Sequence, residues 1–282
     1  MAYLRWKSFA LVCVLALTCA FCLRAQVSER AAEPVPNREK LSEEEIREFL
    51  LKGKVVKARR AGKGITSPYR LTLTDGTLVH DASFQSIDES RSSAQFNAGR
   101  TEVNFRDSYK YNIAAFELAK LLGLGDMMPV TVERKYEGRK GSLSWWLPSK
   151  MDEEQRLAER IVPPDAEDWN RQIHRMKVFS QLIYDTDRNM GNVLISDDWH
   201  VWMIDFSRAF RLHEQLENPK SLVRCDRQLL DKLRRLDADE VIGKTRGFLT
   251  RMEVNGVMKR RDKIVAHFEN LIAQKGEGEV LY

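Results

Sequence analysis

The amino-acid sequence predicts an α+β fold of two lobes, in which a β-rich N-terminal lobe with one main helix precedes a mostly helical C-terminal lobe. Short β-rich segments gather in the first half of the chain, helical patterns dominate the second half, and a charged stretch that ends in a proline pair separates them. Strands gathered first and helices later are typical of this arrangement. With 43% hydrophobic residues among 282, the chain can bury a sizeable core. A cleft between two such lobes is a natural place for a ligand.

The first 25 residues have the three parts of a secretory signal peptide. MAYLRWK is basic, SFALVCVLALTCAFCL is apolar, and RAQ offers a cleavage point near Ala25. The apolar run is shorter than the roughly 20 residues that span a bilayer comfortably. We therefore predict export, periplasmic or secreted, with no membrane span in the mature chain; an uncleaved N-terminal anchor is the alternative. Residues 26–40 are polar, contain two prolines and are predicted to be a linker.

Charge and cysteine content exclude several classes of protein. Without residues 1–25 the formal charge falls from +5 to +2, because 43 basic residues then stand against 41 acidic ones. So small and dispersed a charge argues against a nucleic-acid partner. Only Cys225 of the four cysteines lies outside the predicted signal, which excludes an internal disulfide and a thiolate zinc cluster in the mature chain. We predict that Cys225 is a small buried apolar residue.

The predicted N-terminal lobe, residues 41–147, opens with the helix LSEEEIREFLLKG. Ser42 can cap this helix, and Glu45 three residues later completes a capping box. The β-rich segments KVVKARRA, YRLTLTDG and TLVHDASFQ follow, and Asp75-Gly76 between the last two is a strong hairpin signal.

The rest of this lobe contains a loop, a helix and a second hairpin in the prediction. The polar stretch 86–104 is predicted to be a loop. RDSYKYNIAAFELAKLLGLG is the clearest helix, because its apolar residues form one broad face before Gly123. MPVTVERKYEG and KGSLSWWLP then form a hairpin that turns at Glu137-Gly138.

The predicted C-terminal lobe, residues 148–282, begins with a charged connection over 148–164. DAEDWNRQIHRMKVFSQLIY is a helix whose acidic first turn favours its dipole. The hairpin NVLISDDWHVWMIDF comes next, and three more helices are expected around residues 226–236, 238–252 and 257–274.

A polar loop, DTDRNMGN, interrupts this lobe between the long helix and the hairpin. Asp187 and Asn192 lie five residues apart in it, and Asp205 follows thirteen residues later at a strand end. Phosphoryl transfer needs a carboxylate that orients or deprotonates the attacking hydroxyl, and it needs oxygen ligands that hold a metal ion on the triphosphate. This spacing favours Asp187 in the first role and Asn192 with Asp205 in the second. The alternative is a hairpin-entry turn and a strand end without chemistry.

The motif DRNMGN resembles the Asp-Arg-His-x-x-Asn loop of phosphatidylinositol 3- and 4-kinases, and MIDF resembles their Ile-Asp-Phe-Gly. With YNIAAFELAKLLGL followed by MPVTVERKYEG, residues 54–270 resemble secreted kinases of the Golgi casein kinase type and their uncharacterised bacterial relatives. The resemblance implies a protein kinase-like fold, ATP with Mg²⁺ or Mn²⁺, and a hydroxyl acceptor on a protein, a glycan or a lipid head group. It implies a catalytic loop in which Arg188 braces Asp187, and it places Leu143 to Leu147 near adenine.

The same resemblance marks where this chain departs from the kinases. Gln85 and Asn112 stand where a lysine and a glutamate would form an ion pair, and Glu117 is an alternative glutamate on the same helix. Lys63, in AGKGITSP, is a candidate cation over the nucleotide; Arg100, Arg106 and Lys110 are further candidates. Because the neutral pair departs from the pattern, a pseudokinase or nucleotide-binding module with a protein partner is the alternative function. A metal-dependent phosphohydrolase is a third interpretation.

Overall fold

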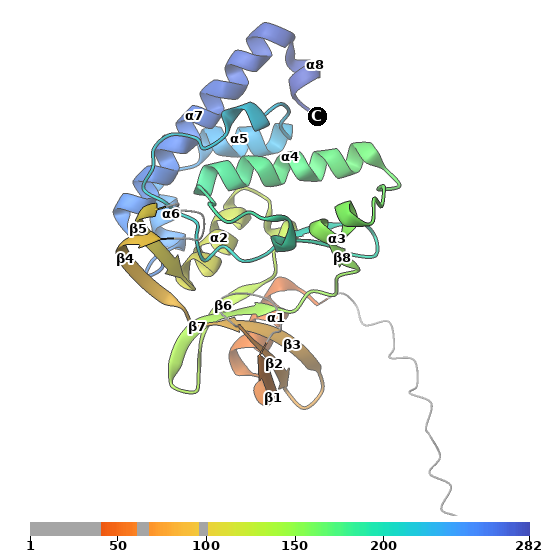
Figure 1. Ribbon diagram of the computed structural model, residues 1–282, viewed down its shortest axis with the longest axis vertical. Coiled ribbons are helices and arrows are strands. Elements are labelled where there is room, and N and C mark those ends of the chain that lie inside the picture. Colours follow the sequence, from red (N-terminus) through yellow and green to blue (C-terminus); the bar gives the residue numbers. More distant parts are fainter. Residues whose placement is uncertain (1–40, 61–67, 96–100) are drawn as a thin grey trace, which may run out of the picture. The chain divides into compact units, whose positions relative to one another are not determined.

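The computed structural model describes residues 41–60, 68–95 and 101–282 (Figure 1). The predicted signal peptide, the predicted linker, Lys63 and Arg100 lie outside the described residues. Within the described ranges, no helix combines the length and apolar character that crossing a membrane requires.

A five-stranded antiparallel sheet forms most of the N-terminal lobe, with strand order β1-β2-β3-β7-β6. Its strands are β1 (Lys54–Arg60), β2 (Tyr69–Thr74), β3 (Val79–Gln85), β6 (Thr131–Tyr136) and β7 (Arg139–Trp145). Both hairpins predicted for this lobe are confirmed, because β2 pairs with β3 and β6 pairs with β7. Glu137 and Gly138 both have positive φ, at 48° and 77°, as the tightest hairpin turns require.

Helix α1 (Glu43–Lys52) packs on this sheet and begins with the predicted capping box. The side chain of Ser42 accepts from the backbone of Glu45, and the Glu45 side chain accepts from the backbone of Ser42. Phe49 and Leu50 enter a small buried core between helix and sheet, completed by Leu71, Leu73, Ala82, Phe84, Val132 and Leu143.

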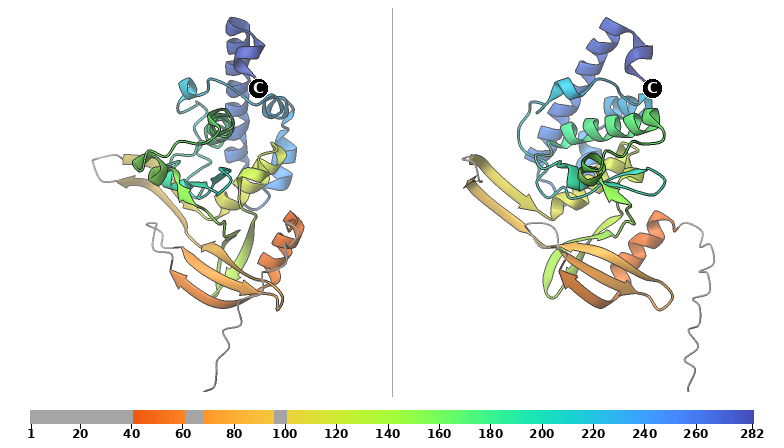
Figure 2. Two further views of the ribbon diagram at one scale, coloured as in Figure 1. Left: turned by 90° about the vertical axis from the view of Figure 1, so that its right-hand side faces the viewer. Right: turned by 45° about the vertical axis from the view of Figure 1, so that its right-hand side comes forward.

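The prediction of a loop at 86–104 is wrong, because β4 (Asp88–Gln95) and β5 (Thr101–Ser108) pair as a separate two-stranded sheet. Figure 2 shows this ribbon apart from the five-stranded sheet. Most of its side chains are exposed, so its sequence lacks the apolar alternation that marks a half-buried strand. Backbone pairing and ion pairs from Glu102 to Arg208 and Arg211 hold it instead.

The predicted helix over 106–125 is α2 (Lys110–Leu121), and its first residues belong to β5 instead. Although α2 precedes β6 in the chain, Tyr111, Phe116 and Leu118 join the larger core of the C-terminal lobe. Helix α2 therefore connects the two lobes.

The C-terminal lobe contains the remaining elements around that larger core. The predicted connection at 148–164 includes β8 (Met151–Asp152) and α3 (Glu153–Ala158); β8 pairs with β9 (Val193–Ile195), which pairs with β10 (Val201–Met203). Short 3₁₀ turns lie at Gly125–Met127, Met190–Asn192 and Pro219–Ser221, and the longer helices are α4 (Ala166–Ile183), α5 (Arg227–Arg235), α6 (Ala238–Lys244), α7 (Arg251–Lys275) and α8 (Glu277–Val280).

Two expectations about the C-terminal lobe have clear outcomes. The helix predicted over 238–252 is too long, because α6 ends at Lys244 and α7 begins with a capping box made by Thr250 and Glu253. Cys225 is fully buried, as predicted, and burial raises the pKa of its thiol to about 12. The α+β fold class and its order of lobes are confirmed.

Candidate functional site

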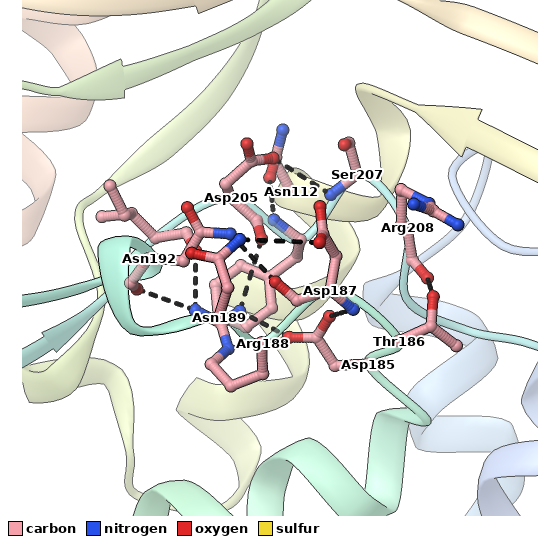
Figure 3. A network of polar contacts seen from close by, with 12 residues as sticks. Asn112, Asp185, Thr186, Asp187, Arg188, Asn189, Asn192, Asp205, Ser207 and Arg208 are labelled. Carbon is pink, nitrogen blue, oxygen red and sulfur yellow. Dashed lines mark hydrogen bonds and ion pairs between the residues drawn. The ribbon is translucent and has the colours of Figure 1, made fainter. Parts of the chain in front are cut away.

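The loop that follows α4 is held in place by Arg188. The Asp185 carboxylate is fully buried, and it accepts from Nε of Arg188 at 2.8 Å and lies 2.5 Å from Nη2 (Figure 3). Nη1 of Arg188 donates to the carbonyl oxygens of Asn192 at 2.8 Å and Ile204 at 2.7 Å. The Arg188 guanidinium thus bonds to two residues of its own loop, Asp185 and Asn192, and to the strand end that precedes Asp205.

Replacing Arg188 by Met is expected to lower the free energy of unfolding by about 3–5 kcal/mol, because Asp185 would remain buried without its partner. Denaturant unfolding measures this change. Arg171→Met is the matched control, since Arg171 pairs with Glu167 at 2.7 Å on the surface and such pairs contribute less than about 1 kcal/mol. Equal effects of the two substitutions would contradict the role of Arg188.

Asp187, the residue before Arg188, is half-buried. Burial raises the pKa of its carboxyl, and the nearby Asp205 and Asp185 carboxylates raise it further; Arg208 and a hydrogen bond from Asn189 act in the opposite direction. A carboxyl surrounded by other carboxyls and held partly out of water is a stronger base than a free aspartate. Perturbation of this kind is enriched at functional sites.

Asn192 and Asp205 lie next to Asp187, as Figure 3 shows. Nδ2 of Asn192 donates to the backbone oxygen of Asp187 at 3.0 Å, which leaves the side-chain oxygen as the atom that can bind a metal ion. Asp205 follows β10 with a left-handed backbone, at φ 56°. Non-glycine residues seldom adopt this conformation, and it is frequent at functional sites. The structure therefore brings the three residues that the sequence singled out into one cluster.

A cavity of about 540 Å³ lies in front of this cluster, a volume in the range of small-molecule sites. Asn192 and Asp205 line it from the C-terminal lobe, whereas Asp187 is not among the lining residues. Trp146 and Leu147, from the stretch predicted to lie near adenine, also line it. The cavity therefore extends from the connection between the lobes to the two candidate metal ligands.

Gln85 and Asn112 meet in the wall of this cavity. Nδ2 of Asn112 donates to Oε1 of Gln85 at 2.6 Å and to Oγ of Ser142 at 3.2 Å, and Oδ1 of Asn112 accepts from the backbone N–H of Phe206 at 2.7 Å. The two amides thus occupy neighbouring positions on β3 and α2 and link them to the segment after Asp205. The link carries no net charge.

Replacing Asn112 by Ala is expected to lower the free energy of unfolding by about 2–4 kcal/mol, because it removes three hydrogen bonds and leaves the buried Phe206 N–H unsatisfied. Gln85→Ala removes one of these bonds and is expected to lower the free energy of unfolding by less, about 1 kcal/mol. Urea unfolding compares the two variants. Asn112→Ala with no greater effect than Gln85→Ala would show that the link to Phe206 contributes nothing.

Glu117 is not brought to the cavity. Its carboxylate pairs with Arg47 of α1 at 2.6 Å and with Lys120 at 3.6 Å, so it fastens α1 to α2. Two of the further candidate cations are also engaged elsewhere: Arg106 lies 3.7 Å from Glu253, and Lys110 lies 2.8 Å from Asp88. Neither Arg106 nor Lys110 therefore lines the cavity, and Lys63 and Arg100 lie outside the described residues.

Sequence reasoning missed several residues at the site. Arg59, Arg60 and Arg70 line the cavity, and Arg208 lies close enough to Asp187 to oppose the rise in its pKa. The paired arginines in KVVKARRA, just before a glycine-containing turn sequence, were an available signal for the first two. Asp185 carried no signal, because its importance lies in its burial.

The donor set fits a divalent metal that also binds phosphate. In the described part of the chain, no group of three or more His, Cys, Asp or Glu side chains is arranged to hold a metal ion. Mg²⁺ on a nucleotide needs fewer protein ligands, because one or two carboxylates share it with phosphate oxygens and water. Asn192 and Asp205 supply oxygen ligands of this kind, and their roles stay predictions.

No protein-family model matches the chain, and no curated protein matches its sequence. Solved structures do match its fold. A structure of hydra Fam20 with sugar has a TM-score of 0.64 at 15% identity, covering 85% of this chain and 91% of that one. A Golgi casein kinase has a TM-score of 0.61 at 13% identity, covering 90% and 84%.

The Golgi casein kinase with Mn/ADP bound gives a TM-score of 0.60 at 12% identity, covering 85% of this chain and 78% of that one. At identities this low, the fold is the property that the proteins share. The three fold matches agree with the β-rich first lobe, the helical second lobe and the cavity beside the loop. This chain therefore has the two-lobed protein kinase-like fold, as its resemblance to the Golgi casein kinase type implies.

Proposed function

We propose that the chain is a phosphotransferase that moves the γ-phosphate of ATP to a hydroxyl acceptor. The observation that carries the proposal is the cluster of Asp187, Asn192 and Asp205, two of which line a cavity of nucleotide size in a kinase-like fold. Phosphoryl transfer depends on positioning and on charge stabilisation, so it needs a general base for the acceptor hydroxyl and oxygen ligands for the metal ion.

Each residue has a defined part in the proposed reaction. Asp187 orients the acceptor hydroxyl and takes its proton, and its raised pKa brings it closer to the pH at which a base is most effective. Asn192 and Asp205 hold the metal ion, which when bound neutralises the phosphate oxygens. Arg188 keeps the loop in register with the strand end through its four hydrogen bonds.

The solved structures support the choice of cofactor and acceptor class. One Golgi casein kinase contains Mn and ADP, and the hydra Fam20 structure contains sugar. For this chain we propose ATP with Mn²⁺ or Mg²⁺, and an acceptor hydroxyl on a protein, a glycan or a lipid head group. We propose no nucleic-acid partner. Export after cleavage near Ala25 remains part of the proposal, with an uncleaved anchor as its alternative.

The test is a transfer assay with the full chain, γ-labelled ATP and either Mn²⁺ or Mg²⁺. Acceptors of the three classes are offered in parallel, and mass spectrometry identifies products that gain a phosphate. Metal-dependent phosphorylation of one class is the expected result. ATP that binds without any transfer, to acceptor or to water, would contradict the proposal.

The neutral link between Gln85 and Asn112 favours a second candidate function, a pseudokinase or nucleotide-binding interaction module. Kinases use a lysine at this position to hold the phosphates, and this chain has no charge there. The second candidate predicts a nucleotide-induced rise in melting temperature without transfer, and action through a protein partner. The transfer assay and a parallel melting experiment therefore distinguish the two.

A further inference from the structure

The segment that follows Asp205 is anchored at its two ends by different parts of the chain. At its far end, the backbone N–H of Phe210 donates to the carbonyl oxygen of Ile183, in α4, at 2.6 Å. At its near end, the carbonyl oxygen of Ser207 accepts from the backbone N–H of Ser108, the last residue of β5, at 2.8 Å. The residues just after Asp205 therefore contact the ribbon of β4 and β5.

Glu102 of β5 reaches the same segment with its side chain. One carboxylate oxygen pairs with Arg208 and the other pairs with Arg211, and all three side chains are largely buried. The guanidinium carbons of the two arginines lie 5.2 and 5.8 Å from the ring centre of Phe105, on the same strand. Strand β5 thus presents a carboxylate and an aromatic ring to two arginines.

The cluster of Glu102, Arg208 and Arg211 contains two positive groups and one carboxylate. Burial lowers the pKa of Arg211, the Glu102 carboxylate raises it, and the Arg208 guanidinium lowers it further. Asp107, further along β5, is a weaker counter-charge, because burial raises the pKa of its carboxyl and one of its oxygens has no hydrogen-bond partner. Without Glu102, two like charges would stay together in a site that holds little water.

Arg208 also contacts the loop that carries Asp187. Its carbonyl oxygen accepts from the hydroxyl of Thr186, the residue before Asp187, at 3.1 Å (Figure 3). Burial raises the pKa of Asp187 and the Arg208 guanidinium opposes this rise, so the positive charge lies near that carboxylate. A series of contacts therefore runs from Glu102 through Arg208 and Thr186 to the proposed base.

We propose, building on the proposed function, that Glu102 is a positioning residue for Asp187. It holds Arg208, whose carbonyl oxygen in turn holds Thr186 and the loop around it. Such a residue acts on turnover, because a displacement of about 1 Å at a reacting group can slow a reaction about 100-fold. It leaves nucleotide binding unchanged, since none of these three residues is among the described residues that line the main cavity.

Steady-state transfer by the full chain, with Mn²⁺ and the acceptor class found in the transfer assay, tests this role. Glu102→Gln is expected to lower kcat about 10- to 100-fold and to leave the KM for ATP within about twofold of the wild type. Glu102→Asp keeps the charge and is expected to recover part of the loss. Glu89→Gln is the matched control with wild-type kcat, because Glu89 lies on the same ribbon and pairs with Arg91 at 2.7 Å in an exposed position.

Hydrogen exchange measured by mass spectrometry tests the same contacts without requiring activity. Glu102→Gln is expected to speed amide exchange in residues 205–211 and in residues 185–192, because Thr186 bonds the second segment to the first. Glu89→Gln is expected to leave both segments at the wild-type rate. Faster exchange in residues 205–211 alone would show that the ribbon does not act on the Asp187 loop, and would overturn the proposal.

The outcomes separate the positioning role from the proposed function. Wild-type kcat in Glu102→Gln would overturn the positioning role and leave the phosphotransferase intact. A wild type without transfer, in which Glu102→Gln still speeds exchange in both segments, would support the series of contacts and contradict the phosphotransferase. An equal loss of kcat in Glu102→Gln and Glu89→Gln would also overturn the role of Glu102.

Circular dichroism melts check that each variant is folded at the assay temperature. Thr186→Val provides a second route if Glu102→Gln is not, because it removes only the hydroxyl that bonds to Arg208. This variant is expected to lower kcat in the same direction with the KM for ATP unchanged. Wild-type kcat in Thr186→Val would overturn the link between the ribbon and Asp187.

Discussion

Replacing Asp187 by Asn is expected to slow phosphate transfer about 10²- to 10⁴-fold, the usual contribution of a general base, while ATP binding stays close to that of the wild type. Asparagine keeps the size of the side chain and can still orient a hydroxyl, but it cannot accept the proton. Asp187 does not line the cavity, whereas Asn192 and Asp205 do. The Asp187→Asn substitution should therefore lower turnover and leave the affinity for nucleotide unchanged.

Initial rates with saturating ATP and the acceptor class identified by mass spectrometry measure this effect. Asp197→Asn is the matched control, because Asp197 is an exposed aspartate in the turn between β9 and β10. Full activity in Asp187→Asn would remove this residue from the mechanism. A loss of ATP binding in the same variant would assign it to the nucleotide site.

The same substitution has a second consequence, for stability. The folded-state pKa of Asp187 is raised, so the folded chain keeps this proton to a higher pH than the unfolded chain does. The resulting stabilisation is present below the unfolded pKa and is lost as pH rises through the folded pKa. At neutral pH the ionised carboxylate is therefore unfavourable in the fold. Asp187→Asn is expected to raise the melting temperature at pH 7 and to lose that advantage in acid.

Replacing Asp205 by Asn is expected to abolish the metal-dependent stabilisation that ATP gives the wild type. A ligand at a hundred times its dissociation constant stabilises the folded state by about 2.7 kcal/mol, or roughly 5–10 °C in melting temperature for a chain of this size. Asp205 supplies the negative charge among the two proposed ligands, and a neutral amide holds a divalent ion much less tightly. Asparagine is the right replacement, because Asp205 has φ 56° and asparagine tolerates left-handed backbone.

Thermal melts with ATP, ADP and adenosine, each with Mn²⁺, Mg²⁺ or a chelator, measure the difference. The wild type should respond to ATP only when metal is present, and Asp205→Asn should show the same melting temperature in every condition. A metal-dependent shift of equal size in both proteins would show that the metal binds elsewhere. The melt without ligand serves as the internal check on folding.

Local chemistry explains why much of the fold could be predicted. The capping box at Ser42 and Glu45, the turns at Asp75-Gly76 and Glu137-Gly138, and the apolar face of α2 each depend on residues a few positions apart. Features that depend on residues so close together in the chain can be predicted from the sequence. The loop with Asp187 and Asn192 is also local, and its spacing together with Asp205 predicted a phosphate site.

The sequence by itself thus determined the order of the lobes, the hairpins and the spacing of Asp187, Asn192 and Asp205. The tertiary structure decided what depends on contact between distant segments. It paired β4 with β5, whose polar exposed residues carry no strand period, and it buried Asp185 against Arg188. It also joined Gln85 to Asn112 and brought Glu102 to Arg208. The physical reason is that burial and charge pairing are properties of neighbours in space, which the spacing of residues along one chain does not encode.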